Sequence, residues 1–200
     1  MKVVLASGNA GKLAELCELL AGSGLELLPQ RALGIDDPVE DGLTFVENAL
    51  IKARNAARRS GLPALADDSG LIVDALGGAP GLISAHYAGA HGDNTRNIAK
   101  VLRELDGVSG DRRGARFYCC LVLLRHADDP QPLIAEGEWP GRILEAPHGD
   151  RGFGYDPVFF DPELGLGAGE MSPEQKNPIS HRGRALASLQ ARLPGWLARP

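Results

Sequence analysis

The spacing of apolar residues predicts strands alternating with helices in the first part of the chain. Residues 2–6 form a short apolar run, and apolar positions within 12–20 follow helical spacing, so a strand, a tight turn and a helix are expected. A second strand is expected at 25–28. The polar stretch that follows, up to Gly42, predicts a long loop, and loops of that length tend to be functional.

The clearest helix start is a capping box formed by Thr44 and Glu47, which predicts a helix through about Arg59, closed by Gly61. Two short strands, 62–66 and 71–73, are expected to flank a polar turn at 67–70. The remaining expected elements are a helix at 93–105, strands at 117–124, 133–139 and 157–160, and a final helix at about 180–193. This order predicts an α/β protein with helix layers around a mixed sheet.

Composition narrows the possible partners of this 200-residue chain, which we expect to be one domain spanning 1–200. A formal net charge of -5 disfavours a long nucleic acid. The longest apolar run, 117–124, is far shorter than the roughly 20 residues that cross a bilayer, so no membrane partner is expected. The three cysteines suggest neither a disulfide framework nor a zinc cluster. We therefore expect a cytoplasmic protein.

A glycine-containing turn, residues 7–12, lies between the first expected strand and helix. Backbone N–H groups at a helix start favour an anion, and Lys12 adds a positive charge, so phosphate binding is one interpretation. The spacing from Gly8 to Gly11 is too short for a Walker loop, and Leu13 stands where that loop has Ser or Thr. A plain turn with a solvated lysine is the alternative.

Two adjacent carboxylates, Asp67 and Asp68, follow an expected strand, and Glu40 lies in the long loop. Magnesium prefers oxygen ligands and keeps several waters, so one or two carboxylates with substrate phosphates are enough to hold it. The alternative is that Asp67 only braces a turn, because Asp side chains commonly do so.

Two later segments carry groups suited to a nucleotide base. Phe153 and Tyr155 surround Gly154 just before Asp156, and an aromatic ring beside a hydrogen-bonding group suits a base, although such aromatics are more often core residues. Residues 172–182 gather Lys176, His181 and Arg182 at the start of the last expected helix. These donors suggest an anion or a carbonyl-rich ligand, with a solvated basic turn as the alternative.

Five segments occur in order along nearly the whole chain: SGNAGKLAEL, EDGLTFVENALIKA, ADDSGLIVDALGGAPGLISAHYAG, FGYDPVF and EQKNPISHRGRAL. Together they closely resemble the inosine-triphosphate pyrophosphatase family. His86 and Gln175 depart from the usual pattern of that family, which has Arg and an acidic residue there. The resemblance implies a three-layer α/β/α fold with an elongated mixed sheet, two lobes flanking a nucleotide cleft, and a homodimer.

The resemblance also implies hydrolysis of dITP, ITP and XTP to the monophosphate and pyrophosphate, which removes aberrant purine nucleotides from the pool. It implies Mg²⁺ held by Glu40 and Asp68, with Asp68 as proton acceptor. It implies substrate contacts from Ser7, Gly8, Asn9, Ala10, Gly11, Lys12, Ser69, Phe153, Gly154, Tyr155, Asp156, Lys176, His181 and Arg182. Within that set, His181 and Arg182 are expected to read the base.

Two other classes are weighed against this one. A P-loop kinase or GTPase is disfavoured by the glycine spacing. A nucleotide-sensing module would bind the triphosphate and leave it intact, and the sequence alone does not separate it from an enzyme.

Overall fold

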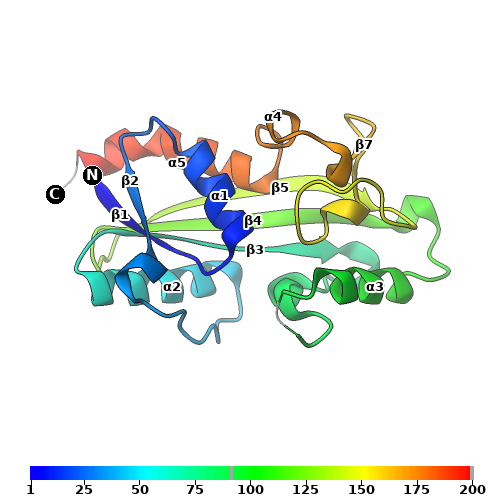
Figure 1. The fold of residues 1–200 in the computed structure, drawn as a ribbon, viewed down its shortest axis with the longest axis horizontal. Coiled ribbons are helices and arrows are strands. Elements are labelled where there is room, and N and C mark those ends of the chain that lie inside the picture. Colours follow the sequence, from blue (N-terminus) through cyan, green and yellow to red (C-terminus); the bar gives the residue numbers. More distant parts are fainter. Residues whose placement is uncertain (91, 199–200) are drawn as a thin grey trace. The chain divides into compact units, whose positions relative to one another are not determined.

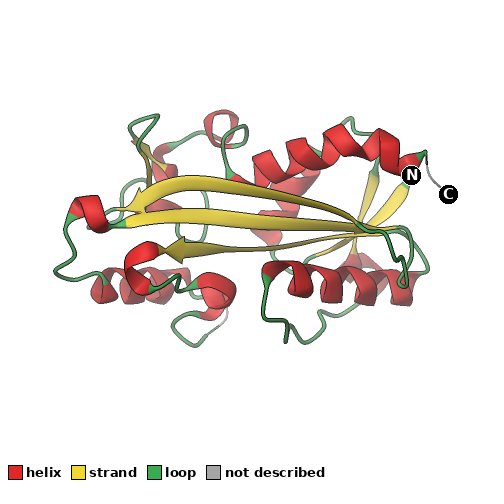
Figure 2. Ribbon diagram, turned by 180° about the vertical axis from the view of Figure 1, so that it is seen from behind, coloured by secondary structure: helices red, strands yellow, loops and turns green. Residues whose placement is uncertain are grey.

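A computed structural model describes residues 1–90 and 92–198 of the chain. Its strands form a seven-stranded sheet in the order β2-β1-β3-β4-β5-β6-β7, shown in Figures 1 and 2. Pairing of β1 with β2 and with β3 is parallel, whereas β5–β6 and β6–β7 are antiparallel, so the prediction of a mixed α/β sheet is confirmed. No helix among the described residues is both long enough and apolar enough to span a bilayer.

The chain folds into two compact units, which are described separately. The first unit contains 1–68, 119–137 and Arg182 onward, and the second contains 69–118 and 138–181. Three strands contribute residues to both: β3 (Ala64–Val73), β4 (Gly114–Leu124) and β5 (Leu133–Ile143). The expected domain 1–200 also includes residues 91, 199 and 200, which lie outside the described residues.

The first unit contains three helices around its part of the sheet. Its elements are β1 (Lys2–Ala6), α1 (Ala10–Leu19), β2 (Glu26–Pro29), a 3-10 turn (Gln30–Leu33), α2 (Phe45–Ser60) and α5 (His181–Leu197), whose first residue belongs to the second unit. Figure 1 shows α1 and α5 on one face of these strands and α2 on the other. Leu16 and Leu186, on the two helices, pack in one core cluster with Leu65 of β3.

The second unit has one longer helix, α3 (Asn94–Glu104). Its other elements are 3-10 turns at Asp74–Leu76, Gly81–His86, Gly110–Arg112, Asp156–Val158 and Ala168–Glu170, strands β6 (Phe159–Asp161) and β7 (Leu166–Gly167), and the short helix α4 (Pro173–Lys176). An aromatic cluster of Phe117, Trp139 and Phe159 lies in its core. The indole N–H of Trp139 donates to Asp161, which satisfies the one polar atom of that buried ring.

The capping box predicted at Thr44 and Glu47 and the helix end predicted at Gly61 are confirmed. The Thr44 hydroxyl oxygen accepts from the backbone N–H of Glu47, and the Glu47 carboxylate accepts from Leu43 and Thr44. Asp93 caps α3 in the same manner by accepting from Arg96 N–H, and Gly61 ends α2 with φ 69°. A positive φ is easy only for glycine, so this helix end follows directly from the residue type.

Several of the predicted element boundaries were wrong. Strand β4 begins at Gly114 rather than at 117, and β5 continues to Ile143 rather than ending at 139. The polar segment 67–70 is no turn, because one continuous strand, β3, runs through it. The predicted strand 157–160 begins later, since Pro157 lies in a 3-10 turn and β6 starts at Phe159. The last helix continues past the predicted end to Leu197, through Pro194. Proline removes one backbone N–H donor and crowds the carbonyl four residues before it, yet the helix continues beyond it to Trp196, which is buried in the core cluster of the first unit.

Candidate functional site

The turn after β1 and the start of α1 form a closely packed backbone segment in the first unit. Asn9 caps α1 by accepting from the N–H of Lys12, and the Ser7 hydroxyl oxygen accepts from the N–H of Asn9. A Cβ built on Gly8 would meet the carboxylate of Asp37, so a larger residue there would require that exposed side chain to move. The first turn of α1 carries no acidic side chain, which leaves its positive end uncompensated by the helix itself.

Asp67 and Asp68 lie in the middle of a strand, so their side chains project to opposite faces of the sheet. On the face covered by α1, Asp67 Oδ2 lies 2.8 Å from Lys12 Nζ. On the face covered by α2, Asp68 Oδ1 accepts from Lys52 Nζ at 2.7 Å. The two neighbouring carboxylates therefore serve different partners.

The two carboxylates also differ in their affinity for a proton. Burial alone raises the pKa of Asp67, but the charges of Lys12, Arg182 and Lys52 outweigh it and hold that pKa well below its ordinary range. Burial raises the pKa of Asp68 to about 6, against the lowering effect of Lys52 and Lys12. Neighbouring carboxylates with separated pKa values are typical of sites where one stays ionised and the other exchanges a proton.

Lys52 of α2 contacts Glu40 as well as Asp68, so the two carboxylates lie close together. Lys52 Nζ lies 2.9 Å from Glu40 Oε2, so one ammonium group contacts both carboxylates. The loop that carries Glu40 is fastened to α2, because Asn48 accepts from Gly42 N–H and Asn55 donates to the Asp36 carbonyl. Burial lowers the pKa of Lys52, but the surrounding carboxylates raise it by more. The pKa therefore lies above its ordinary value, and this side chain stays charged.

Lys52 is a site residue that the sequence analysis did not single out. Its helix buries an alanine-rich face, and Lys52 lies on that face in helical register with Ala49, Ala53 and Ala56. A lysine at an apolar position of a periodic helix is a signal for a buried ion pair, because a charge is rarely buried without a partner. That signal was available in the sequence.

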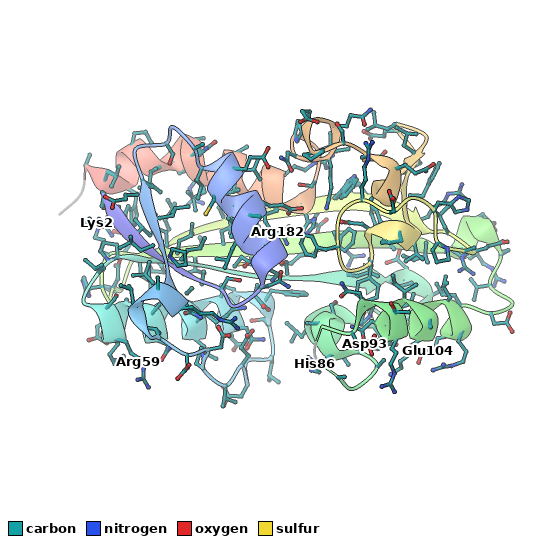
Figure 3. The ribbon with its side chains drawn as sticks, viewed as in Figure 1. Lys2, Arg59, His86, Asp93, Glu104 and Arg182 are labelled. Carbon is teal, nitrogen blue, oxygen red and sulfur yellow. The ribbon has the colours of Figure 1, made fainter. Side chains whose placement is uncertain are left out.

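Arg182 lies in the first unit against α1, where Figure 3 labels it. Its guanidinium donates to the carboxylate of Glu15, and its Nε lies 4.0 Å from Asp67 Oδ2. The side chain is 2% exposed. Glu15 was not predicted as a partner, because helix spacing alone does not show what its side chain meets.

In the second unit, the structure brings together three of the predicted residues: Phe153, Asp156 and Lys176. Asp156 Oδ2 accepts from Phe153 N–H at 2.8 Å and from Lys176 Nζ at 2.6 Å. The ammonium of Lys176 lies 5.2 Å from the centre of the Phe153 ring. The buried Asp156 therefore fixes both the aromatic turn and the lysine.

The other predicted residues of the second unit have mixed surroundings. The Tyr155 hydroxyl donates to the Ser84 carbonyl, and burial raises the pKa of that phenol above its ordinary value. His181 stacks on Phe117 with ring centres 4.8 Å apart. Ser69 is half-buried in β3. The substrate contacts expected of these residues remain predictions.

These features define an α/β protein with a glycine turn, a lysine at a helix start and a lysine-bridged carboxylate pair, which are groups suited to a phosphorylated ligand. Comparison with known proteins gives the family. The Ham1 family model matches residues 3–192. The chain belongs to the Ham1 family.

Similar proteins cover almost the whole chain. The dITP/XTP pyrophosphatase of Thioalkalivibrio sulfidiphilus is 58% identical over 98% of this chain and 100% of that protein. The one from Xanthomonas oryzae pv. oryzae is 62% identical over 96% of each. Among solved structures, a HAM1 protein from Coxiella burnetii has a TM-score of 0.90 and 47% identity, covering 98% of this chain and 99% of that one.

Proposed function

We propose that this chain is a nucleoside triphosphate pyrophosphatase that hydrolyses dITP, ITP and XTP to the monophosphate and pyrophosphate. Relatives of about 60% identity that match nearly from end to end carry the name dITP/XTP pyrophosphatase. The observation that carries the proposal is Asp68, a buried carboxylate that lies on one lysine together with a second carboxylate. A carboxylate held in this way can bind a metal ion and accept a proton from water.

Magnesium fits the residues around Asp68. Its second oxygen, Oδ2, is buried and has no hydrogen-bond partner among the described residues, and a cation is a natural partner for it. The side chain of Glu40 is 38% exposed and contacts Lys52, the lysine that also contacts Asp68. We propose that Glu40 and Asp68 would hold Mg²⁺, and the bound ion would neutralise phosphate charge and make pyrophosphate a better leaving group. No group of three or more His, Cys, Asp or Glu suited to a metal occurs among the described residues, and two carboxylates suffice for Mg²⁺.

The remaining groups of the first unit suit the triphosphate. Backbone N–H groups of residues 7–12 at the start of α1, together with the Lys12 ammonium, would bind phosphate oxygens. Asp68 would accept a proton from the water that attacks the α-phosphorus, while Lys52 holds its carboxylate in place. No covalent intermediate is required.

Other predicted residues carry groups suited to the base. Phe153 would stack on the purine, and Asp156 supports this role by fixing the Phe153 backbone. Ser69, Gly154, Tyr155 and Lys176 would line the nucleotide. His181 and Arg182 would read the base, because an arginine only donates hydrogen bonds and the 6-carbonyl of hypoxanthine and xanthine accepts them.

We further propose that residues 1–200 act as a single pyrophosphatase domain, which the family model over 3–192 supports. The family resemblance supports a homodimer. A cytoplasmic location agrees with a substrate drawn from the nucleotide pool and with cysteines that are free in the structure.

The test is incubation of the purified chain with ITP and Mg²⁺ in ¹⁸O-labelled water. We expect IMP and pyrophosphate, with the label in IMP, because water attacks the α-phosphorus. Orthophosphate would indicate a GTPase-like cleavage instead. Intact ITP that stays bound would indicate a nucleotide-sensing module.

A further inference from the structure

Four charged side chains form an alternating series on the α1 face of β3. In spatial order they are Glu15, Arg182, Asp67 and Lys12. Arg182 donates to Glu15, its Nε lies 4.0 Å from Asp67 Oδ2, and the same oxygen lies 2.8 Å from Lys12 Nζ. One carboxylate oxygen therefore faces both an arginine and a lysine.

The two inner members of the series are buried and the two outer members reach the surface. The side chains of Asp67 and Arg182 are 0% and 2% exposed, whereas those of Lys12 and Glu15 are 17% and 16% exposed. Two positive and two negative charges balance each other. Because a buried charge is tolerated only with a compensating partner, each inner residue depends on both of its neighbours.

Lys12 is the member of this series that lies at the phosphate-binding turn. An ammonium group has three donors, so a lysine held by Asp67 can still donate to another oxygen. Lysine is a flexible side chain, and a fixed carboxylate at 2.8 Å confines its head group to one place. Asp67 points to the sheet face opposite that of Asp68, so its direct contact is with Lys12, whereas Asp68 contacts Lys52.

We propose that Asp67 is a positioning residue that holds the Lys12 ammonium ready for the triphosphate. Glu15 is a second positioning residue, which acts one step further away by fixing Arg182 beside Asp67. The inference rests on the proposed function, since it assigns Lys12 to the phosphates. It assigns neither Asp67 nor Glu15 to the substrate.

The test uses inorganic tripolyphosphate, which carries the phosphates without a base, and measures its binding by calorimetry. Asp67→Asn keeps the size of the side chain and removes its charge. We expect its dissociation constant for tripolyphosphate to rise five- to tenfold in the otherwise wild-type chain, and to change less than twofold when Lys12→Met is also present. Equal weakening in both backgrounds, or no weakening in the first, would overturn the proposal.

Glu15→Gln keeps the test decisive if Asp67→Asn fails to fold, because Glu15 lies near the surface of α1. We expect a two- to threefold weaker binding of tripolyphosphate, which again disappears with Lys12→Met. The control is Glu18→Gln, the same change at an exposed residue three positions further along α1, which should have no effect. Equal effects of the two glutamate changes would show a general charge effect and refute the role of Glu15.

Turnover separates a positioning role from a structural one. With ITP, the Asp67→Asn chain should show a KM raised by the same factor as the tripolyphosphate constant and a kcat within twofold of wild type. A fall in kcat alone would place Asp67 at the reaction itself and overturn the proposal. Calorimetry needs no turnover, so a wild-type chain that binds tripolyphosphate but leaves ITP intact refutes the proposed function and not this inference.

Discussion

Replacement of Lys52 by methionine tests the interpretation of the carboxylate pair most directly. The variant keeps much of the volume of the side chain and removes the ammonium that lies 2.7 Å from Asp68 and 2.9 Å from Glu40. Removing one partner of a buried ion pair costs about 3–5 kcal/mol, because the other charge stays buried without compensation. Glu40 is exposed enough for solvent to screen its share, so the Asp68 contact dominates.

We therefore expect Lys52→Met to lower the free energy of unfolding by about 3 kcal/mol in the absence of metal. For a chain of this size, each kcal/mol moves the Tm by about 2–4 °C, so the expected drop is about 6–12 °C. Scanning calorimetry with a chelator measures it. The matched control is Arg58→Met on the same helix, where the ion pair with Asp128 is largely exposed and should contribute less than about 1 kcal/mol.

Magnesium should then reduce the difference in Tm between the Lys52→Met variant and the wild type. A ligand at a hundred times its Kd stabilises the folded state by about 2.7 kcal/mol, and the two carboxylates of the variant no longer share their charge with an ammonium. Repeating the scans with Mg²⁺ measures this recovery. A drop no larger than that of Arg58→Met, or equal stabilisation of wild type and variant by Mg²⁺, would refute the assignment of this pair to a cation.

The remaining predictions concern turnover. Asp68→Asn should lower pyrophosphate release by about 10²–10⁴-fold while its circular dichroism spectrum stays native, and near-native turnover would remove Asp68 from the mechanism. Lys12→Met should raise the KM for ITP by about tenfold with a smaller change in kcat, as a loss of about 1.4 kcal/mol in binding implies, and an unchanged KM would separate this lysine from the phosphates. Arg182→Ala should lower the ratio of kcat/KM for ITP to kcat/KM for ATP by about tenfold. The change removes a hydrogen-bond donor that the 6-carbonyl of ITP can use and the 6-amino group of ATP cannot. Equal losses for both nucleotides would mean that Arg182 serves its ion pairs with Glu15 and Asp67 instead.

Local signals were readable from the sequence because they depend on a few adjacent residues. The capping box of Thr44 and Glu47 satisfies backbone N–H groups at the start of its own helix, whatever the rest of the fold does. The helix that begins just after Asn9 was also found, since a strand, a polar turn and a helical period follow each other there.

Signals that depend on distant partners were not readable. The segment 67–70 looks like a turn because consecutive polar residues are rare inside a central strand. It is a strand because Lys12 and Lys52, from two helices, compensate its carboxylates on the two faces. Likewise, the contact between Arg182 and Glu15 joins residues 167 positions apart, and no local pattern indicates it.

Asp67 and Asp68 point to opposite faces of the sheet, so the register between β1 and β3 determines which partners each carboxylate contacts. Leu5 pairs with Leu65 and Ala6 with Ala66, and this alignment decides which carboxylate meets α1 and which meets α2. A shift of a strand by one residue exchanges the two faces. An insertion or deletion of a single residue in the apolar stretch before Asp67 would therefore exchange the partners of both acids, although every charged side chain would still be present. Sequence variation in that stretch is accordingly expected to change side-chain size but not length.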